Sequence, residues 1–349
     1  MKIGIDARLL EETGVGRYIR NLIVHLAEID TTNEYVVFLR QKSFDAFSLP
    51  NTRWKKVQAE VAWHTLQEQW VMPTYFYDAK LDLVHIPYHN PPILYNGAMV
   101  VTIHDLTILH FNTGKATTLP IVLYQLKRLG YWLELFVGLR KARHIIAVSQ
   151  TTKREVIEHF HIAANKITVT YEGVDRAFVS SAAKRLIKDP YYLYVGNAYP
   201  HKNLETLIHA MKKEDRLVLV GNDDYFYRRL RDKIHSDSIL FFGPANDTQL
   251  VNLYRNAKAL VFPSLMEGFG LPALEALALG CPIAVSDIPI FHEILGDNAS
   301  YFDPNNPDDI SKVIRSVKKR SIQPEFFNRY SWLKMAKETL ETYERSTRV

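Results

Sequence analysis

The feature that most constrains the fold of this 349-residue chain is a regular alternation of short β-branched runs with longer helical segments. This alternation is typical of βαβ units and a parallel sheet. The predicted strands of the first set are Lys2–Ile5, Tyr35–Leu39, Leu83–Ile86, Val100–Ile103, Ile145–Val148 and Ile167–Val169; those of the second are Tyr192–Val195, Leu217–Val220, Ile239–Phe242, Ala259–Phe262 and Pro282–Val285. The sequence therefore predicts an α/β protein with two Rossmann-like parallel-sheet domains.

The domain boundary is predicted in the polar stretch from Asp175 to Pro190, which lacks strand character. We assign residues 1–175 to the N-terminal domain and residues 176–330 to the C-terminal domain. The apolar spacing from Phe326 to Tyr343 predicts a helix. This tail, residues 331–349, either caps the second domain or crosses back to the first.

Composition and charge limit which binding partners and which cellular compartment are expected. The chain carries a net charge of +5 and a pI near 9.0, which suits nucleic acid, anionic lipid or a phosphorylated small molecule. Nucleic acid is not expected, because the basic residues are scattered and form no recognised module. With one cysteine, Cys281, and no signal-peptide pattern, the sequence predicts a cytoplasmic protein. Since no apolar stretch is long enough to span a membrane, any membrane contact is expected to be peripheral.

The segment from Leu119 to Arg143 mixes aliphatic and aromatic residues with basic ones. Basic amphipathic helices can lie on anionic membrane surfaces. A core-facing helix with a solvated basic face fits the same pattern equally well. Both interpretations stay open at this stage.

The most informative segment runs from Phe262 to Gly280 and reads as strand, glycine turn and helix. Pro272 suits the first helical turn, and Gly280 suits the left-handed position after the last turn. Gly268 and Gly270 allow the backbone to approach a ligand closely, and the helix start attracts phosphate. The segment therefore predicts a diphosphate site.

Two glutamates flank this glycine turn. Glu275, about one turn into the helix, can accept hydrogen bonds from a vicinal diol such as a ribose, and Glu267 precedes the turn. Taken singly, Glu275 is explained as a complement to the helix dipole and Glu267 as a solvated loop residue. The pair with glycines between them is harder to explain in that way.

Separated by seven residues, Glu267 and Glu275 resemble the paired-glutamate motif of the retaining family-four glycosyltransferases, whose GT-B fold has two Rossmann-like domains facing across a cleft. The resemblance covers nearly the whole chain and is closest to mannosyltransferases of surface-polysaccharide assembly, of the O-antigen or lipopolysaccharide type. Its other landmarks are Val195–Asn197, Lys202–Leu204, Ala147–Ser149, Tyr171–Asp175 and Tyr330–Trp332.

The resemblance implies roles for the donor-binding residues. Glu275 would bind the nucleotide ribose, Glu267 would contact the transferred sugar, and Lys202 would neutralise the diphosphate. The remaining donor-binding candidates in this domain are Gly196, Asn197, Gly268, Phe269, Gly270 and Leu271. The chain departs from the family at Asn197 and His201, where many relatives carry an arginine. The resemblance makes the C-terminal domain the nucleotide-sugar donor domain and the N-terminal domain the acceptor side.

Further candidates lie in the N-terminal domain. Gly14 and Gly16 follow the first strand; with Ile19 in the third position they are a poor dinucleotide fingerprint, but they suit a loop of close backbone approach. The resemblance directs this loop toward the donor phosphates and acceptor, although a simple turn explains the glycines too. His104 follows a strand, where open α/β sheets bind ligands, and matches the family's histidine that contacts the donor sugar.

No metal site is predicted. Asp105 and His110 are wrongly spaced for a ligand pair and have no evident third ligand. Asp223 and Asp224 resemble the metal-binding acidic pair of other sugar transferases, but a loop start explains them better.

The combined prediction is retaining, metal-independent hexosyl transfer without a cofactor. The expected donor is GDP-mannose, with GDP leaving by electrostatic stabilisation, and the acceptor is a glycan or a lipid-linked glycan. Alternatives are a nucleotide-sugar epimerase, a glycan phosphorylase of the same architecture or, from a different class, a nucleic-acid-binding protein.

Overall fold

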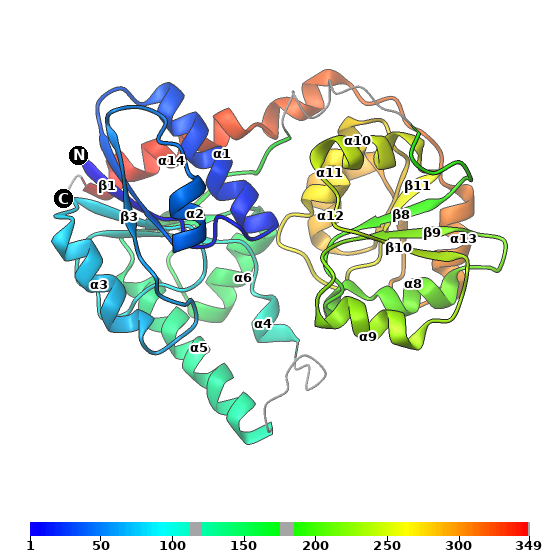
Figure 1. Cartoon of the computed structure of the whole chain (residues 1–349), viewed down its shortest axis with the longest axis horizontal. Coiled ribbons are helices and arrows are strands. Elements are labelled where there is room, and N and C mark those ends of the chain that lie inside the picture. The colour runs from blue at the N-terminus through cyan, green and yellow to red at the C-terminus, as the bar shows by residue number, and fades with distance from the viewer. Residues whose placement is uncertain (112–120, 175–184, 348–349) are drawn as a thin grey trace. The chain divides into compact units, whose positions relative to one another are not determined.

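The computed structural model describes residues 1–111, 121–174 and 185–347 (Figure 1). The chain forms two compact units. Unit 1 comprises residues 1–110, 121–173 and 330–347, and unit 2 is built mainly from residues 185–329. Each unit is a parallel sheet with helices, so the predicted pair of parallel α/β domains is confirmed.

Unit 1 contains a seven-stranded sheet of order β3-β2-β1-β4-β5-β6-β7, with every pairing parallel. The strands are β1 (Lys2–Asp6), β2 (Glu34–Leu39), β3 (Trp54–Gln58), β4 (Leu83–Ile86), β5 (Met99–Ile103), β6 (His144–Ala147) and β7 (Ile167–Val169). The six predicted strands are present, and the edge strand β3 was not predicted. Strands β1, β4 and β5 are almost wholly buried, as expected for a sheet covered on both faces.

The helices of unit 1 are α1 (Gly14–Ile29), α2 (Gln41–Ala46), α3 (Glu68–Asp78), α4 (Thr107–His110), α5 (Ile121–Lys141), α6 (Gln150–Phe160) and α14 (Trp332–Thr347), with the 3-10 turn η1 (Ala164–Lys166). The C-terminal helix α14 lies beside α1 (Figure 1). The Tyr343 hydroxyl on α14 lies 2.6 Å from His85 Nδ1 on β4. The C-terminal helix is therefore part of the core of unit 1.

Unit 2 contains a six-stranded parallel sheet of order β10-β9-β8-β11-β12-β13. Its strands are β8 (Tyr192–Val195), β9 (Leu217–Val220), β10 (Ile239–Gly243), β11 (Ala259–Phe262), β12 (Ile283–Ser286) and β13 (Ser300–Phe302). Its helices are α8 (Leu204–Ala210), α9 (Tyr225–Lys233), α10 (Asp247–Asn256), α11 (Leu271–Ala278), α12 (Pro289–Leu295) and α13 (Pro307–Ser316), with 3-10 turns η2 (Pro200–Lys202), η3 (Gly296–Asn298) and η4 (Pro324–Arg329). The five predicted strands are present, and β13 was not predicted.

Each sheet has one point where the strand order reverses: between β1 and β4 in unit 1, and between β8 and β11 in unit 2. At such a switch point the loops leaving the two strands diverge, and open α/β sheets bind ligands there. The topology therefore marks one candidate ligand position in each unit.

The predicted helix from Phe326 to Tyr343 is wrong at its start. The chain forms the short turn η4, breaks at Tyr330 and Ser331, and begins α14 at Trp332. The break brings the backbone of Ser331 and Trp332 against Gly173, so closely that a Cβ at Gly173 would lie 2.3 Å from the Trp332 nitrogen. Close packing between distant segments, which the periodicity does not record, ends the helical pattern there.

Candidate functional site

Lys202 and Glu267 meet at the switch point of unit 2. Lys202 ends η2 after β8, and Glu267 lies in the loop after β11. Lys202 Nζ is 2.6 Å from Glu267 Oε1, and their side chains are 12% and 9% exposed. The Ser264 hydroxyl donates to the same Oε1 at 2.6 Å. The site thus contains a nearly buried ion pair. Lys202, which is expected to bind phosphate, is paired with Glu267, which is expected to contact the sugar.

The two loops that carry this pair are joined by their backbones. The Leu265 N–H donates to the His201 carbonyl oxygen at 2.8 Å. Asn203, in a left-handed conformation with φ 58°, donates from Nδ2 to the Pro263 carbonyl at 3.2 Å and to the Pro304 carbonyl at 2.7 Å. The positions of Lys202 and Glu267 are therefore fixed by contacts outside the pair.

The glycine turn leads directly into α11, as predicted. Gly270 is the N-cap, with φ 87°, and a Cβ there would lie 2.9 Å from the Phe291 ring. Pro272 lies in the first turn, and Gly280 has φ 70° after the last. Gly268, Phe269 and Leu271 surround this cap. Glycine is required at Gly270 both by the left-handed backbone and by the approach of Phe291.

Glu275 lies on the buried side of α11. It is 4% exposed, and its Oε2 accepts a hydrogen bond from the Tyr254 hydroxyl of α10 at 3.1 Å. Buried carboxylates are costly unless they are hydrogen-bonded, and the Tyr254 hydroxyl supplies one such bond to Glu275.

The loop after β8 is held by tyrosines. The Tyr194 hydroxyl donates to the Asn197 carbonyl at 2.7 Å, and the Tyr227 hydroxyl donates to the Gly196 carbonyl at 2.9 Å. The Gly196 N–H donates to the Val220 carbonyl at 2.9 Å. Gly196 therefore shapes the loop, and its amide is already used within the sheet.

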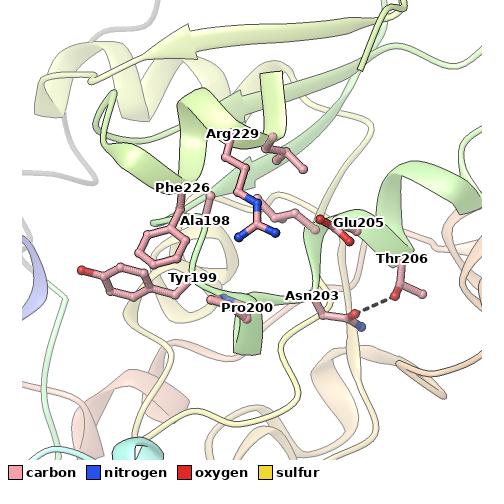
Figure 2. A pocket seen from close by; sticks show the side chains of 10 residues that line it. Ala198, Tyr199, Pro200, Asn203, Glu205, Thr206, Phe226 and Arg229 are labelled. Atoms are coloured by element: carbon pink, nitrogen blue, oxygen red, sulfur yellow. Dashed lines mark hydrogen bonds between the residues drawn. The ribbon is translucent and has the colours of Figure 1, made fainter. Parts of the chain in front are cut away.

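A pocket of about 240 Å³ lies between this loop, α8 and α9 (Figure 2). Tyr199 and Phe226 form an edge-to-face pair on one side, with ring centroids 4.8 Å apart. Figure 2 shows the guanidinium of Arg229 between the Phe226 ring and Glu205. The pocket adjoins η2, but neither Lys202 nor Glu267 lines it.

His104 is fixed at the carboxyl end of β5 in unit 1. Its Nδ1 lies 3.1 Å from Glu172 Oε1, and its Nε2 lies 3.1 Å from the Pro87 carbonyl oxygen. Tyr18 packs edge-on against the ring, with centroids 4.9 Å apart. Because a carbonyl oxygen only accepts, Nε2 must be the donor in that contact. A sugar hydroxyl that bonds a ring nitrogen of His104 has to displace one of these partners.

The two glycines of unit 1 differ in their surroundings. Both lie in the first turn of α1. A Cβ on Gly16 would lie 2.4 Å from the Leu10 carbonyl oxygen, whereas a Cβ on Gly14 would meet no atom of the described residues within 4 Å. Packing within the unit accounts for Gly16, whereas the described residues leave room for a side chain at Gly14.

The aspartates and the histidine considered as metal ligands have other partners. Asp105 accepts the Thr107 N–H at 2.9 Å, and His110 Nε2 lies 3.2 Å from His159 Nε2. Asp224 caps α9, and Asp223 pairs with Arg231 at 2.7 Å, so this pair is a helix start. In residues 1–111, 121–174 and 185–347, no three His, Cys, Asp or Glu side chains gather as a metal site.

Sequence reasoning did not assign roles to three partners of the predicted residues: Glu172 for His104, Ser264 for Glu267 and Tyr254 for Glu275. Glu172 lies inside the landmark Tyr171–Asp175, and Ser264 lies three residues before Glu267. The local sequence patterns could therefore have indicated both residues. Tyr254 comes from another helix, and no local pattern indicates it.

Two glycosyltransferase family models match successive parts of the chain. The family model described as "Glycosyltransferase Family 4" matches residues 13–178, and the one described as "Glycosyl transferases group 1" matches residues 179–331. The chain belongs to the family-four glycosyltransferases, and its fold is GT-B. It is a glycosyltransferase, and its curated relatives include proteins named as O-antigen chain mannosyltransferases.

Two curated relatives illustrate the similarity. The O-antigen chain mannosyltransferase RfbU of Salmonella typhimurium is 29% identical over 255 residues, which cover 71% of this chain and 68% of that protein. The O-antigen chain mannosyltransferase B of Escherichia coli is 27% identical over 342 residues, which cover 86% of each chain.

Solved structures share the fold over nearly the whole chain. Sucrose-phosphate synthase from Thermosynechococcus elongatus has a TM-score of 0.77 at 18% identity and covers 99% of this chain and 98% of that one. HepE of Anabaena, solved in complex with UDP and glucose, has a TM-score of 0.71 at 15% identity and covers 99% of both chains.

Proposed function

We propose that the chain is a retaining, metal-independent hexosyltransferase that moves mannose from GDP-mannose to a glycan or lipid-linked acceptor. The observation that carries the proposal is the Lys202–Glu267 pair at the switch point of unit 2, beside the start of α11. The names of the mannosyltransferase relatives support mannose as the sugar.

Unit 2 is the proposed donor domain. Lys202 and the amides at the start of α11 take the diphosphate, and Glu275 takes the ribose. When the donor binds, the Lys202 ammonium moves from Glu267 to the diphosphate, which frees the Glu267 carboxylate for the hydroxyls of the sugar. Donor binding thus places Lys202 on the diphosphate and Glu267 on the sugar at the same time.

In the proposed reaction the bond between the anomeric carbon and the diphosphate oxygen breaks, and the electron pair leaves with GDP. The acceptor oxygen bonds to that carbon on the same face, and its proton passes to the departing diphosphate. Lys202 and the α11 start stabilise the charge that develops there. No protein nucleophile and no cofactor is assigned.

The first test is calorimetric binding of GDP, UDP, ADP and dTDP, in EDTA and then with magnesium. Micromolar binding of GDP alone, unchanged by magnesium, is the expected result. Preference for another base overturns the donor assignment, and a strict need for magnesium overturns metal independence. Product analysis then tests the stereochemistry: the one-bond coupling between the anomeric carbon and its proton must indicate the same anomer in the transferred sugar as in the donor.

We also propose peripheral contact with an anionic membrane through α5. Leu126, Leu129 and Leu133 recur on one side of this helix and are 60%, 62% and 49% exposed. Trp132 and the exposed Lys127 lie on the same helix. The part of the predicted segment before residue 121 lies outside the described residues. No helix in the described ranges has the length and hydropathy of a membrane span.

Sedimentation with vesicles tests this contact. We expect binding to vesicles of phosphatidylcholine with about one third anionic lipid, weaker binding at high salt, and loss of binding in Leu129→Glu. Val24→Glu, an exposed apolar position on α1, is the matched control. Equal binding of wild type and Leu129→Glu would show that α5 is not the contact.

A further inference from the structure

Three polar side-chain atoms gather without hydrogen-bond partners near the switch point of unit 1. They are His64 Nδ1, His89 Nδ1 and the Tyr131 hydroxyl, and each is inaccessible to solvent with no partner among the described residues. His89 is 5% exposed and Tyr131 is 7% exposed. Buried polar atoms in folded proteins are almost always hydrogen-bonded, so three such atoms in one place require an explanation.

The three rings lie within contact distance of one another. The ring centroids of His64 and His89 are 5.6 Å apart, those of His64 and Tyr131 are 5.7 Å apart, and those of His89 and Tyr131 are 5.5 Å apart. Tyr88 packs on His89, with centroids 3.6 Å apart. His89 and Tyr88 follow β4, so this cluster lies at the carboxyl end of the sheet, where the strand order reverses.

Contacts with neighbouring residues fix the position of His64. Its backbone is left-handed, with φ 56°, which is uncommon for a residue other than glycine. The His64 N–H donates to Glu68 Oε2 at 2.8 Å. Arg8 and Asn90 donate to the other oxygen of Glu68, and Arg8 also pairs with Asp6. Uncommon backbone conformations held in this way cluster at functional sites.

The chemistry of the cluster suits an uncharged ligand rich in hydroxyl groups. Burial lowers the pKa of His64 to about 4, and burial also lowers the pKa of His89. Both imidazoles are therefore neutral near pH 7, and the charge of Arg8 is met by Asp6 and Glu68. Neutral ring nitrogens and a phenol can donate to and accept from hydroxyl groups, and the ring faces pack against apolar C–H surface.

We propose that His64, His89 and Tyr131 form a subsite for a neutral sugar ring of the acceptor. The inference rests on the proposed function, because it names the residues that hold the molecule to which the sugar is transferred. His64 and Tyr88 are only partly buried and form the outer layer. Rotation of the His64 side chain admits the ring, whose hydroxyls then bond the three atoms.

A buried water that bridges the three atoms is the competing explanation, and Tyr131→Phe separates the two. This change removes one hydroxyl and keeps the ring. If the hydroxyl serves a ligand, its removal weakens sugar binding without lowering the melting temperature. If it serves a structural water, the melting temperature falls and sugar binding is unaffected.

The measurement is saturation-transfer NMR on the full chain with the methyl α-glycosides of mannose, glucose, galactose and N-acetylglucosamine. Wild type is expected to bind at least one of them, and Tyr131→Phe to raise its Kd fivefold or more. Tyr35→Phe is the control: the Tyr35 hydroxyl donates to Asp30 at 2.5 Å within the same unit, so its loss should lower the melting temperature and leave sugar binding unchanged.

The inference is overturned if folded wild type binds none of the four glycosides or if Tyr131→Phe binds as wild type does. Calorimetry with GDP on the same preparations separates this failure from that of the proposed function. GDP binding without glycoside binding would overturn the sugar subsite and leave the proposed function intact. Glycoside binding without binding of any nucleotide removes the transferase proposal and leaves a sugar site.

Discussion

Lys202 Nζ and Glu267 Oε1 lie 2.6 Å apart in a pair that is almost inaccessible to water. Taking both charges out of water is costly, and their mutual attraction and the Ser264 hydroxyl offset part of that cost. A phosphate that replaces Glu267 as the partner of Lys202 keeps the cation paired. The structure therefore shows Lys202 with a carboxylate where the proposed function places a diphosphate.

The two members of the pair should respond to substitution with opposite signs. Lys202→Met removes a charged hydrogen bond to the diphosphate, so GDP affinity should fall by about 1.5–3 kcal/mol. Glu267→Gln releases Lys202, so GDP should bind as tightly as to wild type or more tightly, while transfer is lost. Calorimetry and turnover on both variants check this. A parallel fall of GDP affinity in both variants would contradict the exchange of partners.

Glu275→Gln tests the ribose assignment. The glutamine keeps the volume and an acceptor for Tyr254, so the fold should persist. Loss of the charge at the ribose should cost about 1.5–3 kcal/mol of GDP affinity, or roughly 10- to 100-fold in Kd.

The control is 2′,3′-dideoxy-GDP, which lacks the diol. It should bind wild type and Glu275→Gln equally, because neither complex contains the contact. If the substitution weakens both nucleotides to the same extent, Glu275 does not bind the ribose.

The glycines of α1 give a matched pair of substitutions. Gly16→Ala forces a methyl group against the Leu10 carbonyl and should destabilise the protein by about 1–3 kcal/mol. Gly14→Ala meets no atom of the described residues, and alanine favours a helix, so stability should stay or rise by up to about 1 kcal/mol. A fall in kcat/KM for the donor in Gly14→Ala, at full stability, would assign Gly14 to the ligand; unchanged kinetics would leave it a simple turn residue.

The sequence predicted the architecture because central parallel strands are continuous apolar runs. It missed the edge strands Trp54–Gln58 and Ser300–Phe302, although it found the other two edge strands, β7 and β10. The first carries two lysines and a glutamine, as edges that face water do, and the second has no β-branched residue among its three. Their pairing depends on neighbours distant in the chain, which local pattern does not record.

The candidate site was predicted as a set of residues but not as a set of contacts. The spacing of Glu267 and Glu275 and the glycines between them were sufficient to find the α11 start. The pairing of Lys202 with Glu267 joins loops 65 residues apart and follows from strand order, which was not predicted. The His64, His89 and Tyr131 cluster left no signal, because it joins three segments with no shared motif.

Glu134 on α5 gives a prediction about pH and stability in unit 1. Burial, with a smaller contribution from the Glu68 charge, raises the pKa of Glu134 from its ordinary 4.5 to about 8. The folded state thus holds a proton that the unfolded state releases, so the free energy of unfolding should fall as pH rises from about 4.5 to about 8, by roughly 1 kcal/mol per pH unit.

Glu134→Gln carries no titrating proton and keeps an amide oxygen and nitrogen near Gln69, its partner at 3.1 Å. The stability of wild type relative to this variant should therefore decline steadily between pH 5 and pH 8 in urea unfolding. Glu12→Gln, at an exposed glutamate, should show no such slope. A difference between wild type and Glu134→Gln that is constant across this range would show that Glu134 ionises as an ordinary surface carboxylate.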